Sequence, residues 1–490
     1  MSTGITGFGI LFSFASLAVL CAFSQIVGAS ESKTSKRPNI LLLLADDLGY
    51  GELGSYGQKD IRTPRLDALA KGGLRFTDFY SGTAVCSPSR ASLLTGKDSG
   101  NATIRGNKGY LGDYKWDRVP LFKDETTIAQ MLSDSGYETA FIGKWHLGDP
   151  NDLDTWAFAR GFDFAVQPQW SSLFEGETYD EDVHYFGNKE RSLTYDAEEN
   201  DCIDSFRTDI ILDYFEDRSW EKPLFLFMSY RTPHTREKYI RDREMYADRD
   251  WEETERRHAA RITMLDTQVG RLLDDLRERG ELENTLVLFT SDNGPHSEGE
   301  HDYRFFNSSG GLKGYKRDLY EGGIRVPMIA YWEGRIEGGG TTNHQAAFCD
   351  IAPTLAEVGL AESGADMRGL SFLPELLGQE QDEPDYLYWE LQLDGWARVM
   401  PDGGFRQAIR VGDWKGVRYG ASSPLELYNL TEDPGERRDL AALYPEIATD
   451  LIRLMHKARS ENELFPYGGV PQGFRARDRW EAENNEKKNS

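Results

Sequence analysis

Short apolar runs that end in polar residues recur along the chain. Four of them are NILLLLADD, YETAFIGKWH, PLFLFMSYRTPH and NTLVLFTSDNG. Runs that are apolar at nearly every position are typical of strands buried on both faces, as in a parallel sheet covered by helices. Between them lie segments with helical periodicity, such as TIAQMLSDSG and AARITMLDTQVGRLLDDLRERG, which both end in glycine. This alternation predicts an α/β fold, with a mostly parallel central sheet sandwiched by helices.

The polar residues at the ends of the four runs are predicted to share one edge of this sheet. Ligands of open α/β sheets bind beyond the carboxyl ends of the strands, and each run reaches its polar residues at that end. We therefore expect one site that contains Asp46, Asp47, Lys144, His146, His234, Asp292 and Asn293.

The pattern changes after about residue 370. YLYWELQ, FRQAIRVGDWKGVRYG and PLELYNL are typical of short strands joined by turns, and YPEIATDLIRLMHKARS is typical of an amphipathic helix. We expect a main domain over residues 38–370, a smaller α+β subdomain over residues 371–475, and a polar tail over residues 476–490.

The N-terminal segment GILFSFASLAVLCAFSQIVGAS is apolar and ends in small residues. This pattern predicts a signal peptide over residues 1–29, cleaved after Ala29, and export to the periplasm or the medium. The segment before the apolar run has no Lys or Arg, so an uncleaved N-terminal anchor is the alternative. No other segment is apolar enough to cross a membrane.

The charge balance limits the classes of partner. The chain has 56 Lys and Arg against 82 Asp and Glu, a formal net charge of −26. Such a surface repels nucleic acid, so we expect no nucleic-acid binding. An anionic substrate would need a local group of Lys, Arg or metal.

Cys86 lies in the polar stretch AVCSPSRASLLTG. Pro88 is placed to begin a helix, with Ser87 as its N-cap and Gly96 as its end. The start of such a helix favours an anion, and Arg90 lies one turn further on. These residues fit either a thiolate nucleophile or a cysteine that is chemically converted first.

The two other cysteines of the expected exported chain are Cys202 and Cys349. One disulfide between them is an alternative that the sequence leaves open.

Two pairs of residues offer oxygen ligands for a metal. Asp46-Asp47 and Asp292-Asn293 suit Ca²⁺ or Mg²⁺ better than Zn²⁺. Either pair alone is also typical of an ordinary turn, but their equivalent places at strand ends favour a metal site. The loop GGLKGYKRDLYEGGIRVP adds Lys313, Lys316 and Arg317, which are candidates to hold an anionic group, although a basic loop is also typical of a solvated surface.

Cys86-Ser87-Pro88-Ser89-Arg90, followed by ASLLTG, resembles the signature of the type I sulfatases of the alkaline phosphatase-like superfamily. The segments NILLLLADDLGYGELGSYG, GKWHLG, PHT, SDNG and YKRDLYEGGIRVP match the same family, which includes bacterial arylsulfatases and carbohydrate sulfatases. The resemblance extends from about residue 38 to about residue 460, and no core motif residue departs from the pattern.

The resemblance implies a role for each site residue. A maturation enzyme would oxidise Cys86 to formylglycine, and one Ca²⁺, or Mg²⁺ in some members, would bind to Asp46, Asp47, Cys86, Asp292 and Asn293. Arg90 would hold the formylglycine, Lys144 and Lys316 would neutralise sulfate oxygens, His234 would protonate the leaving alcohol, and His146 would assist the elimination of sulfate. Lys316 is preferred to Lys313 because it stands five residues before Glu321, as the lysine of the family does. His184 and His301 are further candidates, for substrate specificity.

The expected activity is that of a sulfuric ester hydrolase acting on a sulfated carbohydrate or an aryl sulfate. One alternative is a phosphoester or phosphonate ester hydrolase of the same superfamily, because some of those enzymes also use formylglycine. The other is a binding protein for sulfated glycans that has kept the fold without catalysis.

Overall fold

The structure, a computed structural model, describes residues 36–111, 116–168, 182–235, 244–393 and 404–469. The predicted signal peptide and the predicted polar tail lie outside these residues. The elements below belong to one compact unit, Arg37–Ser490. Within the described part of the chain, no helix has both the length and the apolar character that a membrane span requires.

The central sheet has ten strands among the described residues. Their order across the sheet is β13 (Gly340–Thr342), β2 (Leu74–Phe76), β12 (Met328–Tyr331), β11 (Thr285–Ser291), β1 (Asn39–Asp46), β10 (Leu224–Pro233), β6 (Glu138–Gly143), β7 (Phe164–Pro168), β8 (Val183–Phe186) and β9 (Arg191–Thr194). The five strands from β11 to β7 are parallel to one another, while antiparallel pairs flank them on both sides. The mostly parallel sheet predicted from the apolar runs is confirmed.

Strand β1 shows why its run is apolar at nearly every position. All eight of its residues are buried. Ile40, Leu42 and Leu44 pack into the core on one face of the sheet, and Leu41 and Leu43 pack into the core on the other. A strand with a hydrophobic core on each side has no solvent face that would select alternating polar residues.

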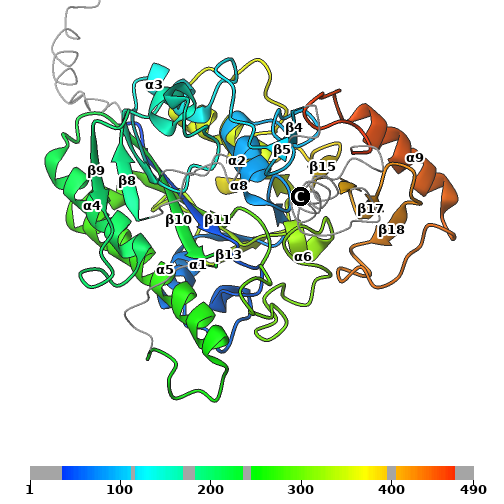
Figure 1. Cartoon of the computed structure of the whole chain (residues 1–490), viewed down its shortest axis with the longest axis horizontal. Coiled ribbons are helices and arrows are strands. Elements are labelled where there is room, and N and C mark those ends of the chain that lie inside the picture. Colours follow the sequence, from blue (N-terminus) through cyan, green and yellow to red (C-terminus); the bar gives the residue numbers. More distant parts are fainter. Residues whose placement is uncertain (1–35, 112–115, 169–181, 236–243, 394–403, 470–490) are drawn as a thin grey trace, which may run out of the picture. The chain divides into compact units, whose positions relative to one another are not determined.

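Helices cover both faces of the central sheet, as predicted (Figure 1). One core contains residues of α2 (Cys86–Thr95), α3 (Ile128–Asp134) and α7 (Phe348–Gly359). The other contains residues of α1 (Pro64–Gly72), α4 (Ile203–Asp217) and α5 (Glu253–Glu278).

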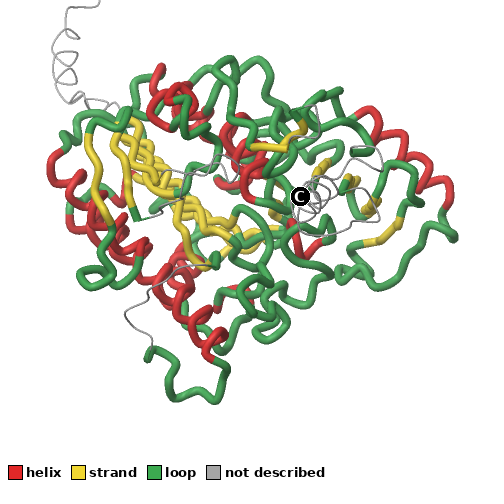
Figure 2. The backbone as a smooth tube through the Cα atoms, viewed as in Figure 1, coloured by secondary structure: helices red, strands yellow, loops and turns green. Residues whose placement is uncertain are grey.

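The C-terminal part forms a separate antiparallel sheet, so the predicted α+β subdomain is confirmed (Figure 2). Its elements are β15 (Leu387–Gln392), β16 (Phe405–Val411), β17 (Trp414–Tyr419), β18 (Glu426–Asn429) and α9 (Pro445–Lys457). The remaining elements are β3 (Phe79–Tyr80) paired with β14 (Ala346–Ala347), β4 (Gly109–Tyr110) paired with β5 (Trp116–Asp117), α6 (Glu321–Ile324), α8 (Leu373–Leu376), and the 3₁₀ turns Gly54–Tyr56, Leu153–Thr155, Ala157–Arg160 and Leu282–Asn284.

The start of α2 differs from the prediction. The helix begins at Cys86 with Val85 in the N-cap position, so Ser87 is not the N-cap. Ser87 lies in the first turn instead, and its hydroxyl donates to the carbonyl of His146 at 3.0 Å. Gly96 ends the helix in a left-handed conformation, with φ 67°, as predicted.

Cys202 and Cys349 are held in different parts of the structure. Cys202 caps the start of α4 and lies in one core, whereas Cys349 lies in α7 and in another. No disulfide joins these two cysteines.

A buried charged trio joins the C-terminal sheet to α6. The ammonium group of Lys415 on β17 lies 2.8 Å from a carboxylate oxygen of Glu321 and 3.0 Å from one of Glu436, and all three side chains have no exposed surface. Burial opposes ionisation of Glu321, but Lys415, with Arg325 and Arg410, lowers its pKa to about 2. Burial raises the pKa of Glu436 to about 7. Lys415 is thus the cation that these two buried carboxyl groups share, and Glu321 also has Arg325 at 3.5 Å.

We predict that Lys415→Met lowers the free energy of unfolding by about 3–5 kcal/mol, because it removes the cation that Glu321 and Glu436 share and leaves Glu436 buried without the partner of its ion pair. Equilibrium unfolding in guanidinium chloride measures the change. Lys457→Met, at an exposed position near the end of α9, serves as the control and should change the value by less than about 0.5 kcal/mol. Equal stability of the two variants would contradict the prediction.

Candidate active site

The ends of four adjacent parallel strands bring the predicted residues to one place. Asp46 ends β1, Asp292 and Asn293 follow β11, His234 follows β10, and Lys144 and His146 follow β6. Backbone hydrogen bonds fix the register of these ends: the amide of His234 donates to the carbonyl of Asp46 at 3.1 Å, and that of Asp292 donates to the carbonyl of Ala45 at 3.1 Å.

Asp47 turns the chain sharply where β1 ends. Its φ is 68°, in the left-handed region that a residue other than glycine seldom adopts. Its amide donates to Oδ1 of Asp292 at 3.1 Å. The turn is therefore tied directly to the end of the neighbouring strand.

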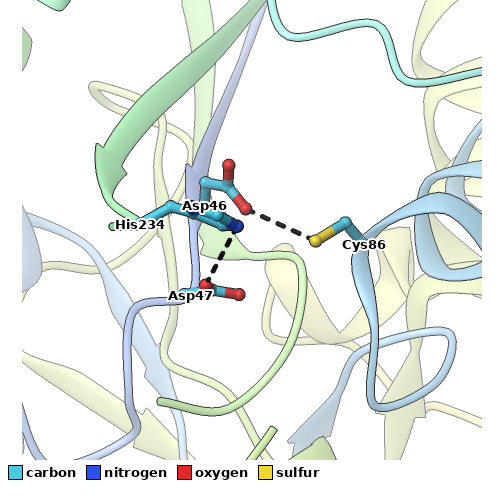
Figure 3. Close-up of side chains that lie close together, drawn as sticks. All are labelled: Asp46, Asp47, Cys86 and His234. Carbon is cyan, nitrogen blue, oxygen red and sulfur yellow. Dashed lines mark hydrogen bonds and ion pairs between the residues drawn. The ribbon is translucent and has the colours of Figure 1, made fainter. Parts of the chain in front are cut away.

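Cys86 faces this edge of the sheet from the first turn of α2 (Figure 3). Its Sγ lies 3.6 Å from Oδ1 of Asp46, and the residue is 2% exposed. Burial raises the pKa of the thiol to about 12, so the unmodified side chain is neutral at pH 7 in this environment.

Arg90, one turn along α2, connects three elements of the site. Its Nε and Nη2 donate to Oδ2 of Asp292 at 2.9 and 2.7 Å. Its Nη1 donates to the carbonyl of Lys144 at 2.7 Å and to the hydroxyl of Ser229 at 2.6 Å. The guanidinium group is fully engaged and buried, so it fixes the position of α2 against the strand ends.

Two lysines neutralise the aspartates at the end of β1. Lys144 Nζ lies 2.6 Å from Oδ2 of Asp46, and Lys316 Nζ lies 2.7 Å from Oδ2 of Asp47. Lys313 points elsewhere, because its ammonium group donates to the hydroxyl of Tyr428 at 2.9 Å.

The electrostatic environments of the two aspartates differ. Burial opposes ionisation of Asp46, but Lys144 and Arg90 hold the pKa of its carboxyl group well below the usual range. At Asp47, burial outweighs Lys316 and raises the pKa to about 6.

Both predicted catalytic histidines are partly buried and lie beside cations. His234 donates from Nδ1 to the carbonyl of Thr235 at 2.9 Å, which leaves Nε2 3.6 Å from Oδ2 of Asp47 (Figure 3). Burial, then Arg231, lowers the pKa of His234 well below its usual value. Burial, then Arg118, does the same for His146, whose φ of 59° is also left-handed.

The oxygen atoms of the cluster fit a hard divalent cation. The side-chain amide of Asn293 donates to Oδ1 of Asp47 at 2.8 Å and to the carbonyl of Gly294 at 2.9 Å. Its Oδ1 is buried and has no hydrogen-bond partner among the described residues, an arrangement that is costly unless a cation supplies the missing contact. Ligand atoms of Asp46, Asp47, Cys86 and His234 lie within 4.8 Å of one another. This buried acidic cluster could therefore hold a metal ion.

A cavity of about 840 Å³ opens over the cluster, and the sequence prediction missed several residues that line it. Arg231 is one of them, with Nη1 3.4 Å from Oδ2 of Asp46. A signal for it was present, because it stands three residues before His234 in the same run, PLFLFMSYRTPH. Glu298 is another residue that was missed, and its Oε1 lies 2.6 Å from Nη2 of Arg317, a residue of the predicted basic loop that also lines the cavity.

The two candidate specificity histidines lie in different places. His301 lines the cavity. His184 lies in β8, fully buried, where its Nε2 accepts a hydrogen bond from Nε of Arg207 at 2.9 Å. The structure does not bring His184 together with the cluster.

Comparisons with known proteins agree with this geometry. The family described as sulfatase matches residues 38–359, and the family described as N-sulphoglucosamine sulphohydrolase, C-terminal, matches residues 311–461. Arylsulfatase A of Homo sapiens is 30% identical, over 87% of this chain and 88% of its own length. N-acetylgalactosamine-6-sulfatase of Homo sapiens is 28% identical, over 89% of this chain and 88% of its own.

The solved structure of Ps i-CgsB in complex with k-i-k-neocarrahexaose has a TM-score of 0.73 at 26% identity, and the match covers 92% of this chain and 98% of that one. The sulfatase family match covers well over half of the chain and includes the strand ends, α2 and Lys316. The sequence motifs, the fold and the comparisons agree, and the chain belongs to the sulfatase family.

Proposed function

We propose that the protein is a sulfuric ester hydrolase that releases sulfate from a sulfated carbohydrate. The observation that carries the proposal is the position of Cys86, which points from the start of α2 into a buried group of oxygen ligands and lysines. The names of relatives support the substrate class, since one is an N-acetylgalactosamine-6-sulfatase and one solved neighbour holds a neocarrahexaose.

The proposed reactive form of Cys86 is formylglycine, made by a separate maturation enzyme, whose hydrated aldehyde supplies a hydroxyl group as the nucleophile. Asp46, Asp47, Asp292 and Asn293 are proposed to hold a Ca²⁺ ion, supported by their oxygen-only ligand set and by the unpartnered Oδ1 of Asn293. The ion would lower the pKa of a hydroxyl group that contacts it.

The remaining residues act on the sulfate group and its proton transfers. Lys144 and Lys316 neutralise sulfate oxygens as negative charge develops, and Arg90 keeps residue 86 in position. His234 protonates the leaving alcohol through Nε2, since its Nδ1 is held by the carbonyl of Thr235. Burial and then the neighbouring cations lower the pKa of this imidazole, and the negative charge of a bound sulfate ester acts in the opposite direction. His146 is assigned to the release of sulfate.

We also propose that residues 1–29 direct export, on the strength of their apolar run and small-residue end. The catalytic domain is assigned to residues 38–370 and the C-terminal subdomain to residues 371–475. The two family matches, over residues 38–359 and 311–461, support an arrangement of this kind.

Replacement of the proposed nucleophile gives the first test. Cys86→Ala should reduce sulfate release by at least about 10³-fold, as removal of a nucleophile does in other hydrolases. Ion chromatography of free sulfate measures the loss, and peptide mass spectrometry across residue 86 checks for the aldehyde. Cys349→Ala, at a buried cysteine in α7, is the control and should keep its activity. An active Cys86→Ala enzyme, or an active enzyme with an unmodified thiol, would refute the proposed nucleophile.

Metal removal gives the second test. Chelation with EDTA should abolish sulfate release, and Ca²⁺ should restore it, because the site offers oxygen ligands. Asn293→Ala should weaken Ca²⁺ binding by about tenfold or more, measured by calorimetry on the folded protein. Full activity in EDTA, or recovery with Zn²⁺ but not with Ca²⁺ or Mg²⁺, would count against the proposed ion.

The two lysines of the basic loop give a matched pair. Lys316→Ala should lower kcat/KM for sulfate release by about 10²–10³-fold, because it removes a cation from the centre where charge develops. Lys313→Ala, three residues earlier and bound to Tyr428, should change kcat/KM by less than about threefold. The assignment of Lys316 fails if the two variants lose similar activity.

A further inference from the structure

The cavity wall is positively charged, whereas the protein as a whole is negatively charged. The chain has a net charge of −26. Eight of the described residues that line the cavity are Lys or Arg, whereas Glu298 is the one acidic residue among them. Such a local concentration of positive charge focuses the field on an anionic ligand.

The basic residues extend well beyond the centre that faces the scissile sulfate. Lys144, Arg231 and Lys316 contact the aspartates of the cluster. Arg257 and Arg261 belong instead to α5, on another wall of the cavity. A single sulfate ester has one negative charge, which the lysines and the proposed Ca²⁺ already offset.

The spacing along α5 presents one face to the cavity. Thr254, Arg257, His258 and Arg261 follow one another at intervals of three, one and three residues, which places them along one stripe of a helix. All four line the cavity. Further along the helix, Ile262 and Leu265, one turn after His258 and Arg261, are buried in the core, so the cavity-lining stretch is confined to the first turns of α5.

Buried contacts tie this face of α5 to the catalytic edge. His258 Nε2 lies 2.6 Å from Oε1 of Glu52, which stands five residues after Asp47, and the amide of Gly49 donates to the other oxygen of Glu52 at 2.6 Å. One turn earlier in α5, Oε2 of Glu255 lies 2.7 Å from Nδ1 of His301. The start of α5 is therefore fixed relative to the sulfate centre, which lowers the ordering cost of binding there.

Arg257 is accessible to a ligand. Its partner is Glu253 on the same helix, and the two side chains are 43% and 65% exposed. An ion pair this exposed contributes about 0–1 kcal/mol, so an anionic group of the substrate can replace Glu253 at little cost. Arg261, one turn further on, is 9% exposed and lines the cavity more deeply.

The described lining offers little to a neutral or aromatic ligand. It contains no Trp, Tyr or Phe among the described residues, so these walls provide no ring on which a neutral sugar or an aryl group would stack. The aliphatic side chains of this described lining are those of Val85 and Leu393. Recognition through charge is the chemistry that these walls support.

From this arrangement we infer that the substrate carries a second anionic group, a sulfate or a carboxylate, and that Arg257 and Arg261 bind it. The substrate class is then a polyanionic carbohydrate. This inference rests on the proposed sulfatase function, and it adds the charge of the neighbouring group, which the catalytic residues do not specify.

A panel of defined sulfated disaccharides tests the inference. One set carries a single sulfate on a neutral disaccharide, a second carries two sulfates, and a third carries one sulfate and a uronic acid. The matured wild-type enzyme should show a kcat/KM at least about tenfold higher for one of the dianionic sets, as expected for charge-assisted hydrogen bonds, mainly through a lower KM. The better set identifies the second group as sulfate or carboxylate.

Variants of α5 assign the preference to its residues. Arg257→Gln and the double variant Arg257→Gln/Arg261→Gln should lose most of the preference in kcat/KM for the dianionic set. The double variant Arg257→Lys/Arg261→Lys should keep part of this preference. Arg256→Gln is the matched control, because Nη1 of Arg256 donates to the carbonyl of Trp251 and this residue does not line the cavity. Because Arg261 is buried, thermal unfolding is recorded for each protein, and the half-buried Arg257 carries the test if the double variant is unstable.

The outcomes separate the two claims. Sulfate release with no preference for a dianionic set, or a preference that survives in Arg257→Gln and the double variant, overturns the inference and leaves the proposed function in place. Failure of the matured wild-type enzyme to release sulfate from any set overturns the proposed function and the inference with it.

Discussion

Three buried carboxylates at the ends of two adjacent strands are the constraint on which the site depends. Asp46, Asp47 and Asp292 are completely buried within a few ångströms of one another, an arrangement that desolvation and mutual repulsion oppose. The structure offsets this cost with cations from separate elements: Arg90 from α2, Lys144 from the end of β6, and Lys316 from the loop after β11. Each ion pair also joins two parts of the fold. The contacts that neutralise the carboxylates are therefore the same contacts that hold the elements of the site together.

The same constraint extends to the C-terminal sheet. Lys316 stands five residues before Glu321 in α6, and Lys415 of β17 holds Glu321 in a buried ion pair. The loop that supplies a cation to Asp47 is thereby fixed at its far end by a second buried charge cluster. This gives the subdomain a physical role in the site, although none of the cluster ligands belongs to it.

The residues at the strand ends could be predicted because burial on both faces makes each run apolar, and the first polar residue then marks the edge of the sheet. Ser87 could not be assigned correctly by helix-cap preferences, since its hydroxyl is used by the carbonyl of His146 in the tertiary structure. The wall formed by α5 was also missed. Its contact between His258 and Glu52 joins residues 206 positions apart, and helical periodicity alone does not distinguish a face that lines a cavity from one exposed to solvent.

The burial of Cys86 affects the order in which its oxidation and the folding of the chain can occur. In the folded chain this side chain is 2% exposed, lies against Asp46, and belongs to the first turn of α2. A side chain this buried, in the wall of a cavity, offers little surface to the active site of a separate enzyme. If residue 86 is converted as proposed, this burial favours oxidation before the chain folds, so that folding then encloses a side chain that is already reactive.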